Sequence, residues 1–503
     1  MCYLTFLAER GLLVKEKLRA YVEKFNNEDV EYYRQDIDNE HSLEWMAENI
    51  PLFECPQKTL EEIYYFRWWV YRKHIKSTDD GYIITEFLPP VSWAGKHNSI
   101  IAAAGHHVSE GKWLKNGHKY LKDYIKFWLE EKSKTYLYSS WLCCSIYELS
   151  KQLNDFSFAI ENLPLIINYY ETMAKEHETN CGLFWSIDGN DAMECSISGT
   201  KGQWHAQKGI RPTLNSYMAA NAFAISKIAE KAGKHQIAKE YAEKYEVIKS
   251  KITEFLWDGE FYKAIHGEDI DNLPSVNEIA PDRDAKELIG YIPWSFCLAP
   301  NGFEKAFSEL KNPEYFKGKY GLFTADKRHP RFMYQNGHEC LWNGYVWPFA
   351  TTQTLDAVNR LLECYEQDFI TKDDFYEMLI TYAGSHYRTL PDGKKLCWID
   401  EVRHPLKDEW SSRAILKVGG WTKEKGGIER GKDYNHSAFC NIVLGGLLGI
   451  KIEDGKIAVN PKIPDSWDYF AVENLWIAGK SYNIYYDKYG TRYGKGKGIR
   501  VIH

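Results

Sequence analysis

The sequence predicts a mainly α-helical domain, a barrel of paired helices, followed by a small β-rich segment at the C-terminus. Apolar residues recur at helical spacing in roughly a dozen segments between residues 58 and 450. Short turns alternate with long polar loops between these segments, and the loops hold most clusters of Trp, Asp, Glu, Arg and His. A ring of helical hairpins would bring one set of these loops to one mouth of the barrel, where a rigid scaffold holds functional residues.

The helical segments follow one another along the chain with few interruptions. In the first, Leu60, Ile63 and Tyr64 fall on one helical face. The expected helices span Thr59 to Lys76, His97 to His107, Trp113 to Glu130, Trp141 to Leu153, Phe156 to Lys175, Pro212 to Ala232, His235 to Leu256, Gly344 to Glu366, Lys372 to Thr389 and Tyr434 to Leu448.

The pattern changes near residue 451. Short β-prone stretches at 457–461, 475–479 and 482–486 are separated by turn residues. We therefore expect three parts: an N-terminal helical segment over 1–50, a helical barrel over 51–450 and a small β-rich appendage over 451–503.

Composition excludes several classes of protein. The net charge of −7 and the lack of a basic stripe argue against binding to nucleic acid through phosphate neutralisation. No run of about eighteen apolar residues predicts a membrane span, and the N-terminus lacks the apolar core of a signal peptide. The eleven scattered cysteines form no CxxC pair, which argues against a zinc or redox motif and favours a reducing cytoplasm.

Two acidic loops about two hundred residues apart indicate the chemistry. The first runs from Trp185 to Glu194 and the second from Trp398 to Val402, and a Trp-rich stretch over 342–348 lies between them. Hydrolysis of a glycosidic bond needs two carboxyl groups, one to protonate the leaving oxygen and one to activate water or attack carbon. Aromatic rings also stack on sugar rings, and the aromatic fraction of 15% is high.

Asp191 is the expected catalytic acid, because Gly189 and Asn190 place it in a tight loop next to aromatic residues. Asp188 and Glu194 are the alternatives, and either carboxyl could raise the pKa of its neighbour. The competing interpretation is an ordinary surface turn, since Asp, Gly and Asn favour turns.

Glu401 is the expected catalytic base, because cationic residues follow it and would keep its carboxylate ionised. Glu409 is the rival, and a salt-bridged loop carboxylate is the structural alternative.

Eight further residues are expected to bind substrate. Arg211 opens a helix, where its planar fork could clamp hydroxyl groups or form an ion pair. No histidine spacing matches a metal motif such as HExxH, so neither a metal nor a cofactor is expected. The predicted substrate-binding residues are Trp93, His97, Trp185, Arg211, Trp342, Asn343, Trp347 and His436.

At these motifs the chain resembles glycoside hydrolases with an (α/α)6 barrel, of the trehalase and glycoside hydrolase family 63 type. The stretch from Trp342 to Pro348 is similar to their WNGPVWP signature, with Tyr345 in place of Pro. The loops carrying Asp191 and Glu401 resemble those that hold the acid and the base of these enzymes. The chain is most similar to bacterial proteins with a mannosylglycerate-hydrolase-like domain, over most of residues 40 to 500.

This resemblance implies an inverting glycosidase. Loops at the mouth of a ring tend to close a pocket, which favours an exo-acting enzyme. The lack of an export signal favours the cytoplasm, and hence a short oligosaccharide or a small glycoside as substrate. Its partner would be a small carbohydrate, without nucleic acid or membrane. One alternative is a sugar epimerase or isomerase on the same barrel, using histidine bases such as His97, His106, His205 or His436. A non-catalytic carbohydrate binder is the other, although it would leave the acid and base motifs unexplained.

Overall fold

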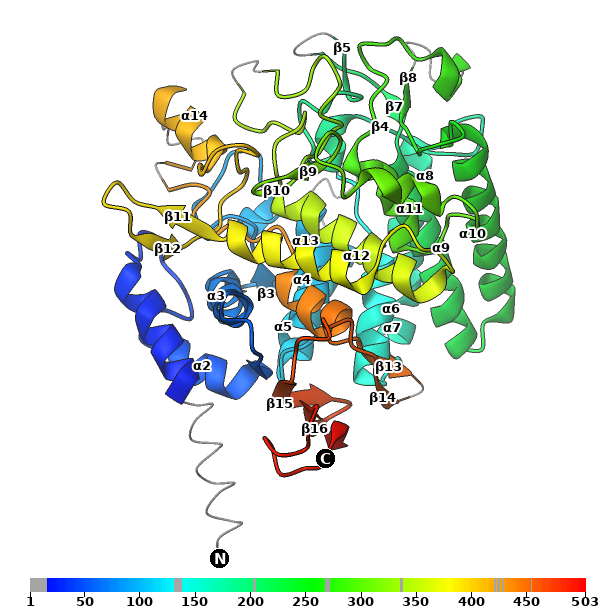
Figure 1. The fold of residues 1–503 in the computed structure, drawn as a ribbon. Helices are drawn as coiled ribbons and strands as arrows, with labels where there is room; N and C mark the ends of the chain where they lie inside the picture. Colours follow the sequence, from blue (N-terminus) through cyan, green and yellow to red (C-terminus); the bar gives the residue numbers. More distant parts are fainter. Residues whose placement is uncertain are drawn as a thin grey trace, which may run out of the picture.

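A computed structural model of the chain describes residues 16–130, 138–201, 205–266, 272–334, 338–419, 422, 426–427, 429–453 and 455–503. Figure 1 shows a helical body with the C-terminal strands at its lower end and other short strands toward its top and at its left. The expectation of a mainly helical fold with a small sheet is confirmed. Of the described helices, none is long and apolar enough to span a bilayer.

A series of inner helices forms the centre of the fold. Each contacts the next along the chain, and the last, α15, contacts the first, α4. This order brings residues more than three hundred positions apart side by side. The inner helices are α4 (Ala104–Gly111), α6 (Leu142–Leu153), α9 (Pro212–Lys231), α11 (Ile292–Ser295), α12 (Pro348–Cys364) and α15 (Phe439–Asn441), which continues as the π-helix η10 (Ile442–Leu447).

A second set of helices alternates with the first along the sequence and packs on its outside. These outer helices are α3 (Lys58–Lys73), α5 (Gly117–Leu129), α8 (Leu163–His177), α10 (His235–Leu256) and α13 (Lys372–Ser385). Shorter elements occupy the connections, namely α2 (Ser42–Asn49), α7 (Ser157–Glu161), α14 (Ser411–Gly419), and the 3-10 turns η1 (Lys96–Asn98), η2 (Ile101–Ala103), η4 (Asp188–Asp191), η6 (Val276–Glu278), η7 (Leu288–Tyr291) and η8 (Glu304–Glu309).

Prolines fix where two inner helices begin. Pro212 and Pro348 each occupy the first turn, with Arg211 and Trp347 extended before them. A first-turn proline loses no helical hydrogen bond, and its fixed φ suits the helix. The Trp-rich stretch predicted to start a helix at Gly344 is therefore non-helical until Pro348.

The C-terminal strands form one antiparallel sheet with a strand from the start of the barrel region. The order is β1 (Leu52–Glu54), β15 (Tyr469–Ile477), β16 (Lys480–Asp487) and β17 (Gly498–Ile502), and Phe53 pairs with Val472. The buried side chains of Phe53, Phe470 and Ile484 belong to the same core as the helices. The appendage over 451–503 thus packs on the helical body, and β1 of that body forms the edge strand of its sheet.

The other described strands form short pairs and one three-stranded sheet. They are β2 (Ile75–Thr78) with β3 (Gly81–Ile84), β4 (Trp185–Ser186) with β7 (Gly209–Ile210) and β8 (Ile265–His266), β5 (Thr200–Lys201) with β6 (His205–Ala206), β9 (Lys317–Gly318) with β10 (Gly321–Leu322), β11 (Tyr387–Thr389) with β12 (Lys395–Cys397), and β13 (Ile450–Glu453) with β14 (Lys456–Val459).

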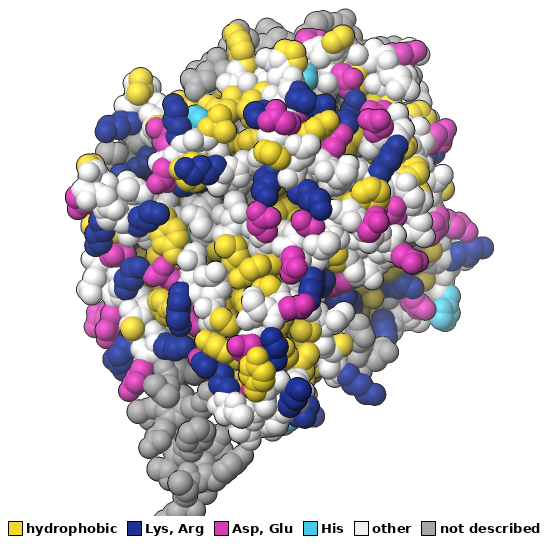
Figure 2. Space-filling model, in the orientation of Figure 1, with side chains coloured by type: hydrophobic (Ala, Val, Ile, Leu, Met, Phe, Trp, Pro, Cys, Tyr) yellow, Lys and Arg dark blue, Asp and Glu magenta, His cyan; other side chains and the backbone are white. Residues whose placement is uncertain are grey.

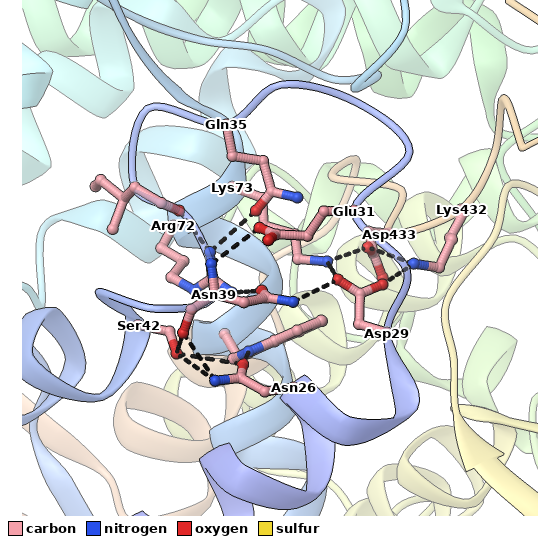
Figure 3. A network of polar contacts seen from close by, with 12 residues as sticks. Asn26, Asp29, Glu31, Gln35, Asn39, Ser42, Arg72, Lys73, Lys432 and Asp433 are labelled. Carbon is pink, nitrogen blue, oxygen red and sulfur yellow. Dashed lines mark hydrogen bonds and ion pairs between the residues drawn. The ribbon is translucent and has the colours of Figure 1, made fainter.

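The N-terminal segment is helical over 16–28 and in α2, and a polar network fixes the loop between them. Lys73 Nζ lies 2.7 Å from both Asp29 and Asp433, and Lys432 also pairs with Asp29 (Figure 3). Arg72 donates to Gln35 and to backbone nearby. Residues 26–42 are thus joined to the loop that precedes α15.

Acidic and basic side chains are interspersed on the molecular face drawn in Figure 2. Small apolar patches lie between them, and this face carries no continuous basic stripe. This distribution agrees with the acidic net charge of the chain.

A buried carboxylate links the first inner helix to the last. Glu110 of α4 is 1% exposed and accepts the N–H groups of Cys440 and Asn441 at 2.9 and 2.7 Å. These N–H groups lie in the first turn of α15, where a helix has no internal acceptors for them. The carboxylate also places negative charge at the positive end of the helix.

We predict that Glu110→Ala lowers the free energy of unfolding by about 2 to 3 kcal/mol, because it leaves two buried N–H groups unbonded. Urea denaturation would measure the loss. Glu110→Gln keeps one oxygen as an acceptor but turns its NH₂ group toward the other N–H, so it should lose less than Glu110→Ala and still be less stable than wild type. An alanine variant that unfolds at the wild-type urea concentration would show that this contact does not hold the two helices together.

Candidate functional site

A cavity of about 190 Å³ lies where the loops before the inner helices meet. Glu86 follows β3, Glu194 follows η4, and Glu401 follows β12. The other lining residues come mainly from the stretches before α12 and α15. The cavity is lined by Glu86, Phe87, Trp93, Ile100, Tyr138, Ala192, Glu194, His338, Glu339, Cys340, Trp347, Glu401, Arg430, Tyr434 and His436.

Arg430 is the cation that faces the carboxylates of this cavity. Its guanidinium is buried, pairs with Glu401 and lies 3.1 Å from Glu339 Oε1. Burial raises the pKa of Glu401, and the charge of Arg430 and its hydrogen bond oppose that rise. Arg430 therefore favours the ionised form of Glu401 in a cavity that would otherwise protonate it.

Glu194 lies in the same cavity and carries a carboxyl of a different character. Burial raises the pKa of this carboxyl to about 8, and the nearby carboxylates of Asp188 and Glu401 contribute to the rise. The backbone carbonyl of Glu194 accepts the N–H of Trp342 at 3.3 Å, which joins the first acidic loop to the Trp-rich stretch. A carboxyl group with such a pKa is mostly protonated at neutral pH and can act as an acid.

A third group of polar residues lines the cavity beside this pair. Tyr434 donates to Glu86 Oε1 at 3.0 Å and is also bonded to His436 Nδ1. Among the described residues, neither Glu86 Oε2 nor His436 Nε2 has a hydrogen-bond partner, although both atoms are buried. Burial raises the pKa of Glu86 well above its ordinary value and lowers the pKa of His436. Both shifts favour the neutral form, and each group has a polar atom that no other described residue binds, as hydroxyl recognition requires.

Four of the residues predicted from the sequence line the cavity, namely Glu401, Trp93, Trp347 and His436. Trp342 does not line it but stacks on Trp347 with ring centroids 4.2 Å apart. Asn343 donates its amide to the backbone of Tyr334 at 2.7 Å.

Asp191 and Arg211 lie together outside the cavity lining. Arg211 Nε is 2.5 Å from Asp191 Oδ2, which Thr213 also binds, and Ser139 donates to Oδ1 at 2.6 Å. Both side chains are buried. Each carboxylate oxygen of Asp191 is thus occupied by protein donors.

The remaining predicted residues also lie away from the lining. The ring of Trp185 is covered by the Lys208 ammonium at 3.7 Å, and Glu409 is exposed. His97 Nε2 lies 2.7 Å from Asp80 and 3.4 Å from Asp79, so these three could hold a cation. Lys96 already pairs with Asp80, and the two aspartates are exposed. The side chain of His205 is outside the described residues.

The lining residues that were not predicted from the sequence include three charged ones, Glu86, Glu339 and Arg430. Glu86 and Arg430 occur in the two stretches, Thr85 to His107 and Glu429 to His436, that carry part of the family resemblance. Glu339 lies just before the Trp-rich stretch. Their position close to these motifs was the one sign in the sequence that they belong to the site.

Comparison with known proteins identifies the class of this site. A family model described as mannosylglycerate hydrolase MGH1-like glycoside hydrolase domain matches residues 96–437. A solved structure named sialidase is 34% identical with a TM-score of 0.86, and the match covers 97% of this chain and 43% of that one. This chain therefore spans less than half the length of that protein.

More distant structures share the fold. A family 63 mannosylglycerate hydrolase from Thermus thermophilus, in complex with glucose, is 10% identical with a TM-score of 0.51, over 75% of this chain and 98% of its own. An α-L-rhamnosidase from Dictyoglumus thermophilum is 13% identical with the same score, over 88% and 43%. The chain belongs to the family of mannosylglycerate hydrolase MGH1-like glycoside hydrolase domains.

Proposed function

We propose that this enzyme is an exo-acting, inverting glycosidase in which Glu401 is the base and Glu194 is the acid. The observation that carries the proposal is the cavity that places a carboxyl with a pKa of about 8 in the same small space as an arginine-paired carboxylate. Pairs of carboxyls whose environments separate their pKa values divide acid and base roles in this way.

Glu194 is a better candidate for the acid than Asp191, which stays the alternative. Glu194 lines the cavity, and its pKa is raised by burial. Asp191 is buried behind the lining with both oxygens bonded to Arg211, Thr213 and Ser139. An acid must reach the leaving oxygen and carry a proton, and the surroundings of Glu194 favour both.

Glu401 is the proposed base because Arg430 opposes its protonation. One carboxylate oxygen pairs with Arg430, and the other is available to orient a water molecule. In an inverting mechanism this water attacks the anomeric carbon from the face opposite the leaving group.

The size and charge of the cavity support a small, uncharged sugar at the cleaved end. A volume of about 190 Å³ is below the range of roughly 300–1,000 Å³ typical of drug-sized ligands, which favours one ring over a chain. Among the described lining residues, Arg430 is the one arginine or lysine. Its guanidinium already pairs with Glu401 and Glu339, so no second such cation among the described residues lines the cavity to bind a substrate carboxylate. We therefore propose a short oligosaccharide or small glycoside with a neutral terminal sugar.

The helical ring and the location complete the proposal. The contacts from α4 through α15 and back to α4 support an (α/α)6 barrel with the site at one mouth. A cytoplasmic location rests on the sequence alone. The epimerase alternative has no support from the family to which the chain belongs.

One prediction concerns pH. Glu401 must be ionised, so activity should fall as the pH drops through its pKa. Glu194 must be protonated, so activity should fall as the pH rises through about 8.

Glu401→Gln and Glu194→Gln should each lower kcat/KM by about 10²–10⁴.

The two variants should differ in how they respond to the leaving group. Glu194→Gln should recover on aryl glycosides with acidic leaving groups and lose the alkaline limb of its pH profile, whereas Glu401→Gln should not recover. An unchanged alkaline limb in Glu194→Gln would exclude Glu194 as the acid.

Another prediction separates the acid from the buried ion pair. Asp191→Asn should lower the free energy of unfolding by about 3 kcal/mol or more, because it leaves the buried Arg211 without its charge partner. Glu194→Gln should change it by no more than about 1 kcal/mol. If Asp191→Asn instead denatures like wild type and loses activity by several orders of magnitude, Asp191 is the acid.

A further prediction concerns substrate and stereochemistry. In a screen of nitrophenyl glycosides and disaccharides, neutral glycosides should be cleaved from the non-reducing end, and NMR should detect the inverted anomer first. Release of the retained anomer would contradict the inverting mechanism. Preferred cleavage of sialosides or uronides would contradict the neutral sugar, and mid-chain cleavage without monosaccharide would contradict the exo mode.

A further inference from the structure

Two cysteines far apart in the sequence lie together at the end of the inner helices away from the candidate site. Cys297 follows α11, and Cys364 is the last residue of α12. Their sulfur atoms are 3.3 Å apart, with Cys297 as the donor. Cys364 is exposed and Cys297 is partly exposed, so small reagents can reach the pair. Neither thiol contributes to the proposed glycosidase chemistry.

The surrounding structure holds these two segments against each other. The Tyr365 hydroxyl donates to the carbonyl of Ala299 at 2.9 Å. Tyr365 directly follows Cys364, and Ala299 lies two residues after Cys297. The Ser295 hydroxyl donates to the carbonyl of Gln353 at 3.1 Å, which also ties α11 to α12. The sulfurs thus stay close without a covalent bond, at a separation of 3.3 Å against about 2.0 Å in a disulfide.

The two thiols have different surroundings. The hydrogen bond from Cys297 lowers the pKa of Cys364 below its ordinary value, and the positive charges of Arg360 and Lys451 act in the same direction. The same bond raises the pKa of Cys297. The thiolate is the reactive form of cysteine. An exposed thiol that lies near cations and accepts a hydrogen bond from a second thiol is therefore suited to react with an oxidant.

We propose that Cys297 and Cys364 are a site of reversible oxidation, in which a peroxide converts the pair to a disulfide and Cys364 reacts first. The Cys364 thiolate attacks one peroxide oxygen and breaks the O–O bond, which leaves a sulfenic acid and, after protonation, one water molecule. The Cys297 sulfur then attacks the Cys364 sulfur, its proton goes to the departing hydroxide, and a second water molecule leaves. The two thiols lose two electrons in total, and the peroxide gains them.

The disulfide would join the two ends of a chain segment that contributes residues to the candidate site. Glu339 and Trp347 both lie between the two cysteines in the sequence and line the cavity. A cross-link across this segment restricts the unfolded chain, so oxidation should raise the thermal midpoint of the protein. A dithiol reagent should reverse both the cross-link and the shift.

The test is a peptide map of the full chain before and after a stoichiometric dose of hydrogen peroxide, with free thiols blocked by N-ethylmaleimide. We expect a dithiothreitol-sensitive peptide pair joining Cys297 to Cys364, and none in Cys364→Ser. Cys181→Ser, which removes another partly buried thiol, should form the pair like wild type. Recovery of both cysteines as maleimide adducts after peroxide treatment would overturn the proposal.

Two substitutions of Cys297 test the order of reaction. Cys297→Ser keeps a hydroxyl donor but has no resolving thiol, so dimedone should trap a sulfenic acid on Cys364. Cys297→Ala removes the donor, so the pH at which iodoacetamide alkylates Cys364 at half its maximal rate should rise toward the ordinary thiol value of about 8.5. Identical alkylation profiles in wild type and Cys297→Ala, or dimedone on Cys181 in place of Cys364, would contradict the assigned role of Cys364.

Discussion

The charge of Arg430 is the constraint on which the candidate site depends. Carboxyl groups crowded into a small cavity repel one another when ionised, and burial adds a further cost. One buried guanidinium binds both Glu401 and Glu339 and so offsets that cost for two of the four glutamates that line the cavity. Within the part of the chain that the structure describes, Glu194 and Glu86 pair with no arginine or lysine, and their pKa values rise. Arg430 thus opposes the rise in the pKa of Glu401, whereas burial dominates the pKa values of Glu194 and Glu86.

The loop that carries Arg430 is positioned by the N-terminal segment and by the inner helices. Lys432 and Asp433 belong to the network with Asp29 and Lys73 that Figure 3 shows. Beyond them, the N–H groups at the start of α15 bind Glu110 of α4. A residue of the N-terminal segment and a residue of the first inner helix therefore both restrain the chain that follows Arg430. This explains why the described part of residues 1–50, expected as a separate helical segment, contacts the body of the enzyme so closely.

Periodicity was sufficient to predict the long helices, because their burial follows a regular pattern. It was less informative where local chemistry interrupts that pattern: the predicted helix from His97 begins only at Ala104, after two residues with positive φ, His97 and Asn98. For the site, the acidic and aromatic residues of the loop over 398–402 were enough to predict that Glu401 belongs to the site. The choice between Asp191 and Glu194 depends on which side chain turns toward the cavity, and that is decided by Arg211 and Thr213, which reach Asp191 from another segment. Arg430 and Glu86 likewise acquire their contacts only where distant loops meet.

The same kinds of residue therefore serve different purposes at positions a few residues apart. Asp191 and Glu194 share one loop, yet the first is enclosed by three protein donors and the second faces the cavity. Arg211 pairs with the carboxylate of Asp191, whereas the nearby carboxylate of Glu401 contributes to the raised pKa of Glu194. In the proposed mechanism, a proton on Glu194 is then available to the leaving glycosidic oxygen. Once that proton has been transferred, repulsion from Glu401 favours its replacement, because the ionised form of Glu194 is the less stable one in this cavity.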